Sequence, residues 1–101
     1  PKGRHSWFGF PMVINQTAPF SVDEFREHLE RNGVETRPII AGNMALQPAI
    51  KMYPHRIHGD LKNCTHVMNN GLAVASHQSL DSHSLEYIVS TIDSFMKVKG
   101  I

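Results

Sequence analysis

The clearest periodic pattern in the chain lies toward its C-terminal end. Between Ser82 and Val98, apolar residues recur at steps of three and four: Leu85, Ile88, Val89, Ile92, Phe95 and Met96. This spacing places the apolar side chains on one face of a helix. We therefore predict an amphipathic helix over residues 82–98.

A second helix is predicted from the signals at its first turn. Ser21 is followed three residues later by Glu24, the capping-box pattern in which each side chain satisfies the other residue's backbone donor. Phe20 precedes the cap and Phe25 occupies the fourth helical position, the spacing of a hydrophobic staple. The helix is expected to cover residues 22–32, because a glycine follows directly.

Three segments rich in β-branched, aromatic or small apolar residues predict strands. The first covers residues 6–15, and Pro11 within it favours an edge position because proline cannot donate to a sheet. The second covers residues 34–40 (VETRPII) and the third covers residues 72–76 (LAVAS).

The remaining patterns predict two shorter helices, over residues 46–53 and 63–69. The order is then strand, helix, strand, short helices, strand and helix. This order is typical of a two-layer α/β (α+β) domain, with helices on one face of a small, mostly antiparallel sheet. At 101 residues, the chain is expected to form one domain over residues 1–101.

Composition excludes several classes of partner. Ten Lys and Arg residues against nine Asp and Glu residues, without a basic stripe, do not favour nucleic-acid binding. No apolar run approaches the roughly twenty residues that span a bilayer, so no membrane partner is expected. The single Cys64 excludes an internal disulfide and favours a reducing, cytoplasmic location. Because the first residue is not methionine, we expect the chain to be part of a longer protein.

Catalytic and metal-binding patterns are not found. The seven histidines include His55 and His58, three residues apart, but neither an HExxH nor a CxxC pattern completes a ligand set. No metal site and no catalytic residue are therefore predicted in this chain.

The segment VETRPII carries the most suggestive polar residues. Side chains two apart on a strand share a face, so Glu35 and Arg37 should project to the same side. An Arg can form paired hydrogen bonds with a phosphate, and Asn43 just beyond could bind sugar hydroxyls. The same residues are equally compatible with a surface ion pair on an edge strand.

Four segments in this order extend the interpretation: SWFGFPMVI, APFSVDEFREHLERNGVETRPIIAGNMALQPAI, PHRIHGDLKNC and NNGLAVASHQ. Together they resemble the C-terminal part of the DegT/DnrJ/StrS aminotransferase family. Within the family, they are most similar to the 3-dehydrases of nucleotide-linked 4-keto-6-deoxyhexoses, which serve lipopolysaccharide O-antigen biosynthesis. Ala75-Ser76 departs from the Gly-Asn pair expected in that branch, so a sugar aminotransferase stays an alternative.

The resemblance implies the C-terminal small domain of a fold type I (aspartate aminotransferase-like) enzyme. Pyridoxal phosphate (PLP) or pyridoxamine phosphate (PMP) would lie in an absent large domain, and the parent would be a homodimer. This chain, inactive alone, would close over the nucleotide sugar with Glu35, Arg37, Asn43 and His77. The alternatives are a free-standing binding or dimerisation module of the same type and an unrelated small enzyme that uses His and Arg.

Overall fold

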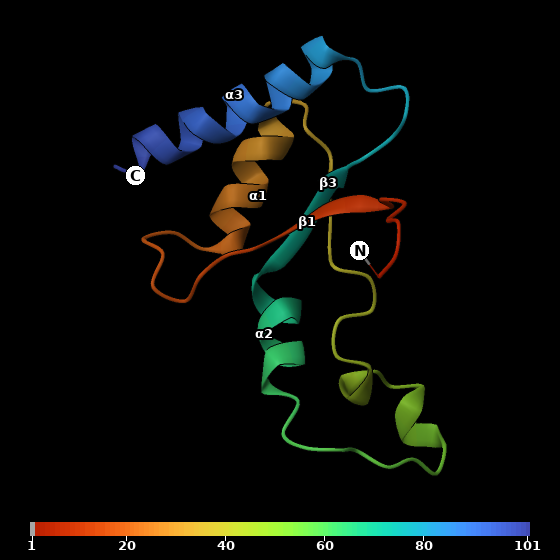
Figure 1. The fold of residues 1–101 in the computed structure, drawn as a ribbon. Coiled ribbons are helices and arrows are strands. Elements are labelled where there is room, and N and C mark those ends of the chain that lie inside the picture. The colour runs from red at the N-terminus through yellow and green to blue at the C-terminus, as the bar shows by residue number, and fades with distance from the viewer. Residues whose placement is uncertain (1) are drawn as a thin grey trace.

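The computed structural model describes residues 2–101. Its elements follow the order β1 (Gly9–Val13), α1 (Val22–Arg31), β2 (Thr36–Arg37), η1 (Met44–Leu46), η2 (Ile50–Met52), α2 (Lys62–Asn70), β3 (Gly71–Ala75) and α3 (Ser82–Val98), where η marks a 3-10 helix. The helices predicted over residues 22–32, 63–69 and 82–98 are confirmed, with ends that differ by at most one residue (Figure 1).

The three strands form one antiparallel sheet in the order β1-β3-β2. Val74 of the central strand lies opposite Phe10 of β1 and Thr36 of β2, which fixes the register on both sides. Pro11 therefore belongs to an edge strand, as predicted, where its missing N–H removes the fewest hydrogen bonds.

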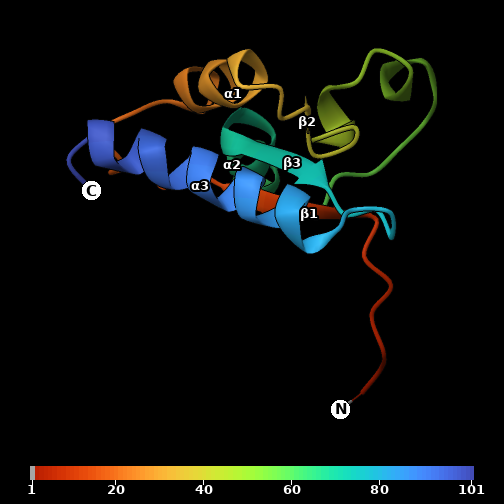
Figure 2. The same ribbon diagram turned by 90° about the horizontal axis from the view of Figure 1, so that it is seen from above.

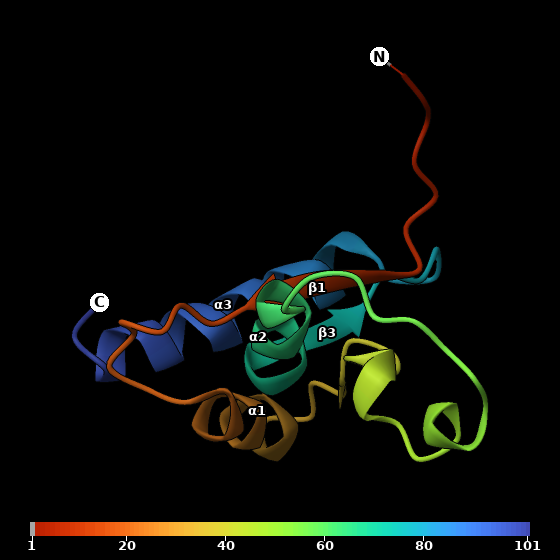
Figure 3. The same ribbon diagram turned by 90° about the horizontal axis from the view of Figure 1, so that it is seen from below.

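The hydrophobic core covers one face of this sheet. Leu72 and Val74 project from β3 into a buried cluster that contains Phe25 and Leu29 of α1 and Phe95 of α3. Because side chains alternate along a strand, Ala73 and Ala75 face the other way. The predicted two-layer arrangement, with α1 and α3 on one side of the sheet, is confirmed (Figures 2 and 3).

The N-terminus of α1 forms as its sequence predicts. Ser21 Oγ accepts a hydrogen bond from the Glu24 backbone N–H at 3.2 Å, and Glu24 Oε2 accepts one from the Ser21 N–H at 2.8 Å. The Phe20 and Phe25 rings lie 6.0 Å apart, which confirms the hydrophobic staple. These contacts fix where the helix begins.

The Glu24 carboxylate also forms an ion pair with Lys99, the residue that follows α3. The Lys99 Nζ lies 2.6 Å from Glu24 Oε1. This hydrogen bond from Lys99, with those at the cap, lowers the pKa of Glu24. A lowered carboxyl pKa stabilises the fold above the unfolded-state pKa, and this contribution is lost as the pH falls through the folded-state pKa. We expect Lys99→Met to be less stable than the wild type at pH 7, and the difference to shrink as the pH falls below 4.5, the unfolded-state value, and through the lower pKa of the folded state.

Urea denaturation of both proteins from pH 7 to pH 3 measures this difference. Lys97→Met is the matched control, because this exposed lysine forms no ion pair among residues 2–101. A deficit in Lys99→Met that stays constant across this range would contradict the role of the Glu24 carboxylate.

Two predicted strands are shorter in the structure. Residues 6–15 were expected to be extended, but only Gly9–Val13 pair, because their partner β3 is itself five residues long. Of residues 34–40, only Thr36–Arg37 pair. Pro38 ends the pairing because it has no N–H, and the chain then turns at Ile39, whose carbonyl accepts from the Gly42 N–H at 3.0 Å.

The helix predicted over residues 46–53 is wrong. Two 3-10 helices, η1 and η2, replace it, and Pro48 lies between them without a donor to continue a helical hydrogen-bond series. Figure 1 shows this part of the chain standing away from the sheet, and residues 51–60 are all exposed. No helix among residues 2–101 is both long enough and apolar enough to cross a membrane.

Candidate functional site

The face of the sheet opposite the core carries small side chains. Gly9 and Pro11 of β1 lie beside Ala73 and Ala75 of β3, on the side that α1 and α3 leave uncovered. A hollow of about 410 Å³ lies over this face and continues along β2 and the N-terminal segment. Its floor is apolar, and short side chains there leave room for a ligand.

Glu35 and Arg37 form the polar edge of this hollow. Their side chains share a face, as predicted, and form an ion pair. Thr36 between them points the opposite way, is buried, and donates through Oγ1 to Glu30 Oε1 at 2.6 Å. The two charged side chains remain 71% and 77% exposed, so the pair contributes little to stability. Its charges are instead available to a ligand in the hollow.

Asn43 is used within the chain. Its Oδ1 accepts from the Ala45 N–H at 3.0 Å and caps η1, and its Nδ2 donates to Thr65 Oγ1 of α2 at 3.0 Å. The residue is buried and does not line the hollow. The structure thus separates Asn43 from Glu35 and Arg37, and its amide fastens the loop after β2 to α2.

His77 lies just beyond β3, where its Nδ1 accepts from the Ser79 backbone N–H at 3.1 Å. Its exposed ring lines a second hollow of about 590 Å³, between the N-terminal segment and α3. Trp7 and Ala75 border both hollows. His77 is therefore adjacent to the ion pair's hollow without sharing it.

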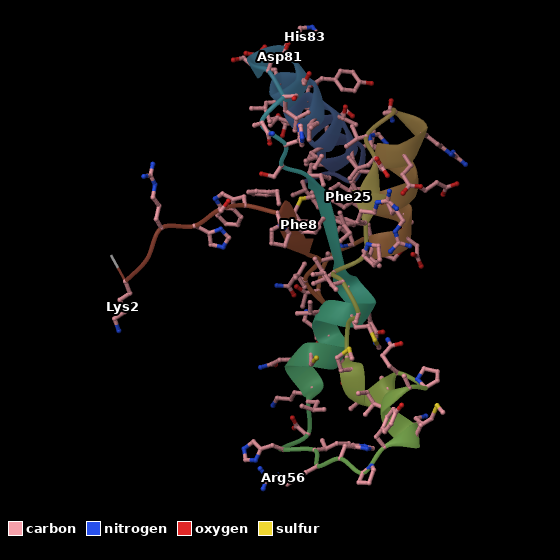
Figure 4. The ribbon with its side chains drawn as sticks, turned by 90° about the vertical axis from the view of Figure 1, so that its right-hand side faces the viewer. Lys2, Phe8, Phe25, Arg56, Asp81 and His83 are labelled. Carbon is pink, nitrogen blue, oxygen red and sulfur yellow. The ribbon has the colours of Figure 1, made fainter. Side chains whose placement is uncertain are left out.

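Aromatic side chains of the N-terminal segment are exposed at the end of the sheet where β1 begins and β3 ends. Trp7 is 55% exposed and Phe8 91% exposed, and the His5 and Trp7 rings stack with centroids 4.1 Å apart. Trp7 and Phe8 both line the hollow and leave an open apolar surface at this end of the sheet. Figure 4 shows the segment carrying Lys2 leading away from α1 and α3.

Ile40 lies at the site although no residue pattern indicated it. This residue lines the hollow with a backbone φ of +29°, in a region that β-branched residues rarely adopt. The Ala41-Gly42 pair indicated that the strand ends, but no residue pattern predicts a positive φ at an isoleucine.

Residues 1–93 match the model of the DegT/DnrJ/EryC1/StrS aminotransferase family. The chain belongs to this family. Among curated members, lipopolysaccharide biosynthesis protein RfbH of Salmonella typhimurium is 31% identical over 94 residues, which are 93% of this chain and 22% of that protein.

Solved structures of the family share the fold. The chain is similar, with a TM-score of 0.82 and 28% identity, to E. coli GDP-4-keto-6-deoxy-D-mannose-3-dehydratase with bound hydrated PLP. The match covers 89% of this chain and 23% of that one. A mutant GDP-4-keto-6-deoxymannose-3-dehydratase with bound GDP-perosamine gives a TM-score of 0.81 at 28% identity, over 89% of this chain and 24% of that one.

The chain therefore spans less than a quarter of these relatives. Neither of the two hollows described above is lined by a lysine that could hold PLP covalently. The lysines are instead exposed or, for Lys99, paired with Glu24. The residues that line these two hollows therefore do not fit a covalently held PLP.

Proposed function

We propose that this chain is the substrate-closing domain of a PLP- or PMP-dependent nucleotide-sugar 3-dehydratase, acting in lipopolysaccharide sugar biosynthesis. The observation that carries the proposal is the exposed Glu35–Arg37 pair at the edge of an apolar hollow, on the sheet face that α1 and α3 leave uncovered. Similarity to two 3-dehydratase structures supports a dehydratase over an aminotransferase.

Within this proposal, the two charged residues orient the nucleotide sugar. The Arg37 guanidinium offers several N–H donors to a phosphate or a keto oxygen, and the Glu35 carboxylate accepts from sugar hydroxyls. Trp7 supplies an apolar wall for the carbon face of the sugar. His77 contacts the substrate from the neighbouring hollow, and Asn43 acts indirectly, by holding the loop after β2.

The cofactor and the reacting groups belong, in this proposal, to a large domain elsewhere in the same polypeptide. The chain's share of its relatives and the lack of a suitable lysine in the described hollows both support this division. The exposed Phe8 then contacts the large domain, and the complete protein works as a homodimer.

Titration with PLP tests the division directly. The 101-residue chain and the longer protein that contains it are each mixed with PLP, and the absorbance of bound cofactor is recorded. We expect only the longer protein to give the spectrum of a bound cofactor. Specific binding by the short chain would place the cofactor site within it and overturn the proposal.

Removing the Arg37 guanidinium tests the substrate-facing role of β2. In the longer protein, we expect Arg37→Ala to lower kcat/KM for GDP-4-keto-6-deoxymannose by about 100-fold, the size expected when a charge-assisted hydrogen bond is lost. The side chain is 77% exposed, so the thermal unfolding midpoint should not change.

Arg31→Ala provides the matched control for this measurement. Arg31 is 75% exposed and is paired with Glu27 on α1. It therefore resembles Arg37 in its exposure and in its pairing with a glutamate, but it lies outside the hollow. Equal kcat/KM in Arg37→Ala and Arg31→Ala would show that the β2 pair is only a surface ion pair.

A further inference from the structure

Ile40 has a backbone conformation that its residue type disfavours. Its φ of +29° is one of two positive values at non-glycine positions among residues 2–101. A Cβ carrying two branches crowds the backbone in this region, which makes such a residue an outlier. Outliers of this kind persist only where the surrounding structure enforces them, and they gather at ligand sites.

Anchors after Ile40 enforce this conformation. The Gly42 N–H donates to the Ile39 carbonyl at 3.0 Å and closes a turn around Ile40. Gly42 in turn has a φ of +62° and packs so tightly on Met68 that an added Cβ would lie 2.4 Å from Met68 Cγ. The turn therefore has no room to move toward α2, and the strained backbone conformation stays at Ile40.

No packing within this chain offsets the strained conformation of Ile40. The Ile40 side chain is 80% exposed, yet it lines the same hollow as Arg37. An exposed isoleucine in a disfavoured conformation costs stability without burying apolar surface in this chain. Its position is explained if the side chain is buried against a ligand.

We propose that Ile40 is a specificity-determining residue that contacts the C6 methyl group of a 6-deoxy sugar. This inference rests on the proposed function and names the part of the substrate that this residue contacts. The ion pair binds polar groups of the ligand, while Ile40 supplies an apolar surface beside it. A hydroxyl group at C6 would lose its water there without gaining a hydrogen-bond partner.

The test compares two ligands that differ only in this hydroxyl. The longer protein is titrated with GDP-6-deoxymannose and with GDP-mannose by calorimetry. We expect the wild type to bind the 6-deoxy ligand at least about tenfold more tightly. In Ile40→Asn, the side-chain amide can bond to the hydroxyl, so the ratio of the two Kd values should fall below about threefold. Ile57→Asn, at an isoleucine 51% exposed and outside the hollow, should keep the wild-type ratio.

Each outcome decides a different point. Equal Kd values in the wild type, or an unchanged ratio in Ile40→Asn, would overturn the role of Ile40 and leave the proposed function intact. If the wild type binds neither ligand, the proposed function itself fails and the inference fails with it.

A stability measurement tests the strain separately. Asparagine tolerates positive φ better than isoleucine, so the unfolding midpoint of the 101-residue Ile40→Asn chain should rise, by up to about 5 °C. The midpoint of Ile57→Asn should stay within about 2 °C of the wild type. A lower midpoint for Ile40→Asn would show that no strain is held at this position.

Discussion

Phe25→Ala should lower the free energy of unfolding by about 3–5 kcal/mol, a large part of the stability of a chain of this size. Phe25 is 1% exposed and is one of the three largest fully buried side chains. Its ring lies 5.2 Å from that of Phe95, so it joins α1 to α3 as well as to the sheet. Alanine would leave a cavity where these elements meet. Urea denaturation followed by circular dichroism measures the loss.

Phe8→Ala is the control for this prediction. The same ring is removed, but Phe8 is 91% exposed, so the free energy of unfolding should change by no more than about 0.5 kcal/mol. Comparable losses in the two variants would mean that the core described around Phe25 does not carry the stability of the chain.

Gly71→Ala should cost about 2–3 kcal/mol of unfolding free energy, by crowding rather than by a cavity. Gly71 opens β3 directly after α2, and a Cβ there would lie 2.4 Å from the Val67 carbonyl oxygen and 2.8 Å from Ile39 Cγ1. The carbonyl belongs to the backbone of α2 and cannot rotate away. Helix and strand must separate to admit the methyl group.

Gly9→Ala adds the same methyl group at the other end of the β1–β3 pairing. Its Cβ would meet the Val74 oxygen at 3.4 Å and Ala73 Cβ at 3.6 Å, both ordinary contacts. We expect a loss of less than about 1 kcal/mol, and thermal unfolding of both variants gives the comparison. A Gly71→Ala chain as stable as Gly9→Ala would contradict the close junction between α2 and β3.

Features that depend on neighbouring residues were predictable from the sequence. The capping box at Ser21 and Glu24 formed because both partners lie within one helical turn. The shared face of Glu35 and Arg37 followed from strand alternation, with Thr36 buried between them. Local geometry determines both features, whatever the rest of the chain does.

Features that depend on distant contacts were not predictable. Asn43 has the chemistry of a sugar ligand, but Thr65, twenty-two residues away, binds its amide instead. The positive φ of Ile40 follows from the turn that Gly42 closes and from the packing of Gly42 on Met68, and neither contact has a local signature. The position of His77 in a second hollow likewise depends on where Ser6 and Trp7 of the N-terminal segment lie.

The strand order determines when the sheet can assemble during synthesis. β1 and β2 pair only with β3, and β3 ends at Ala75. As the chain leaves the ribosome, neither earlier strand has a partner until Ala75 has emerged. Met12 and Ile14, which join the core in the folded chain, stay uncovered throughout that interval, and exposed apolar surface of this kind is prone to aggregation until the central strand arrives.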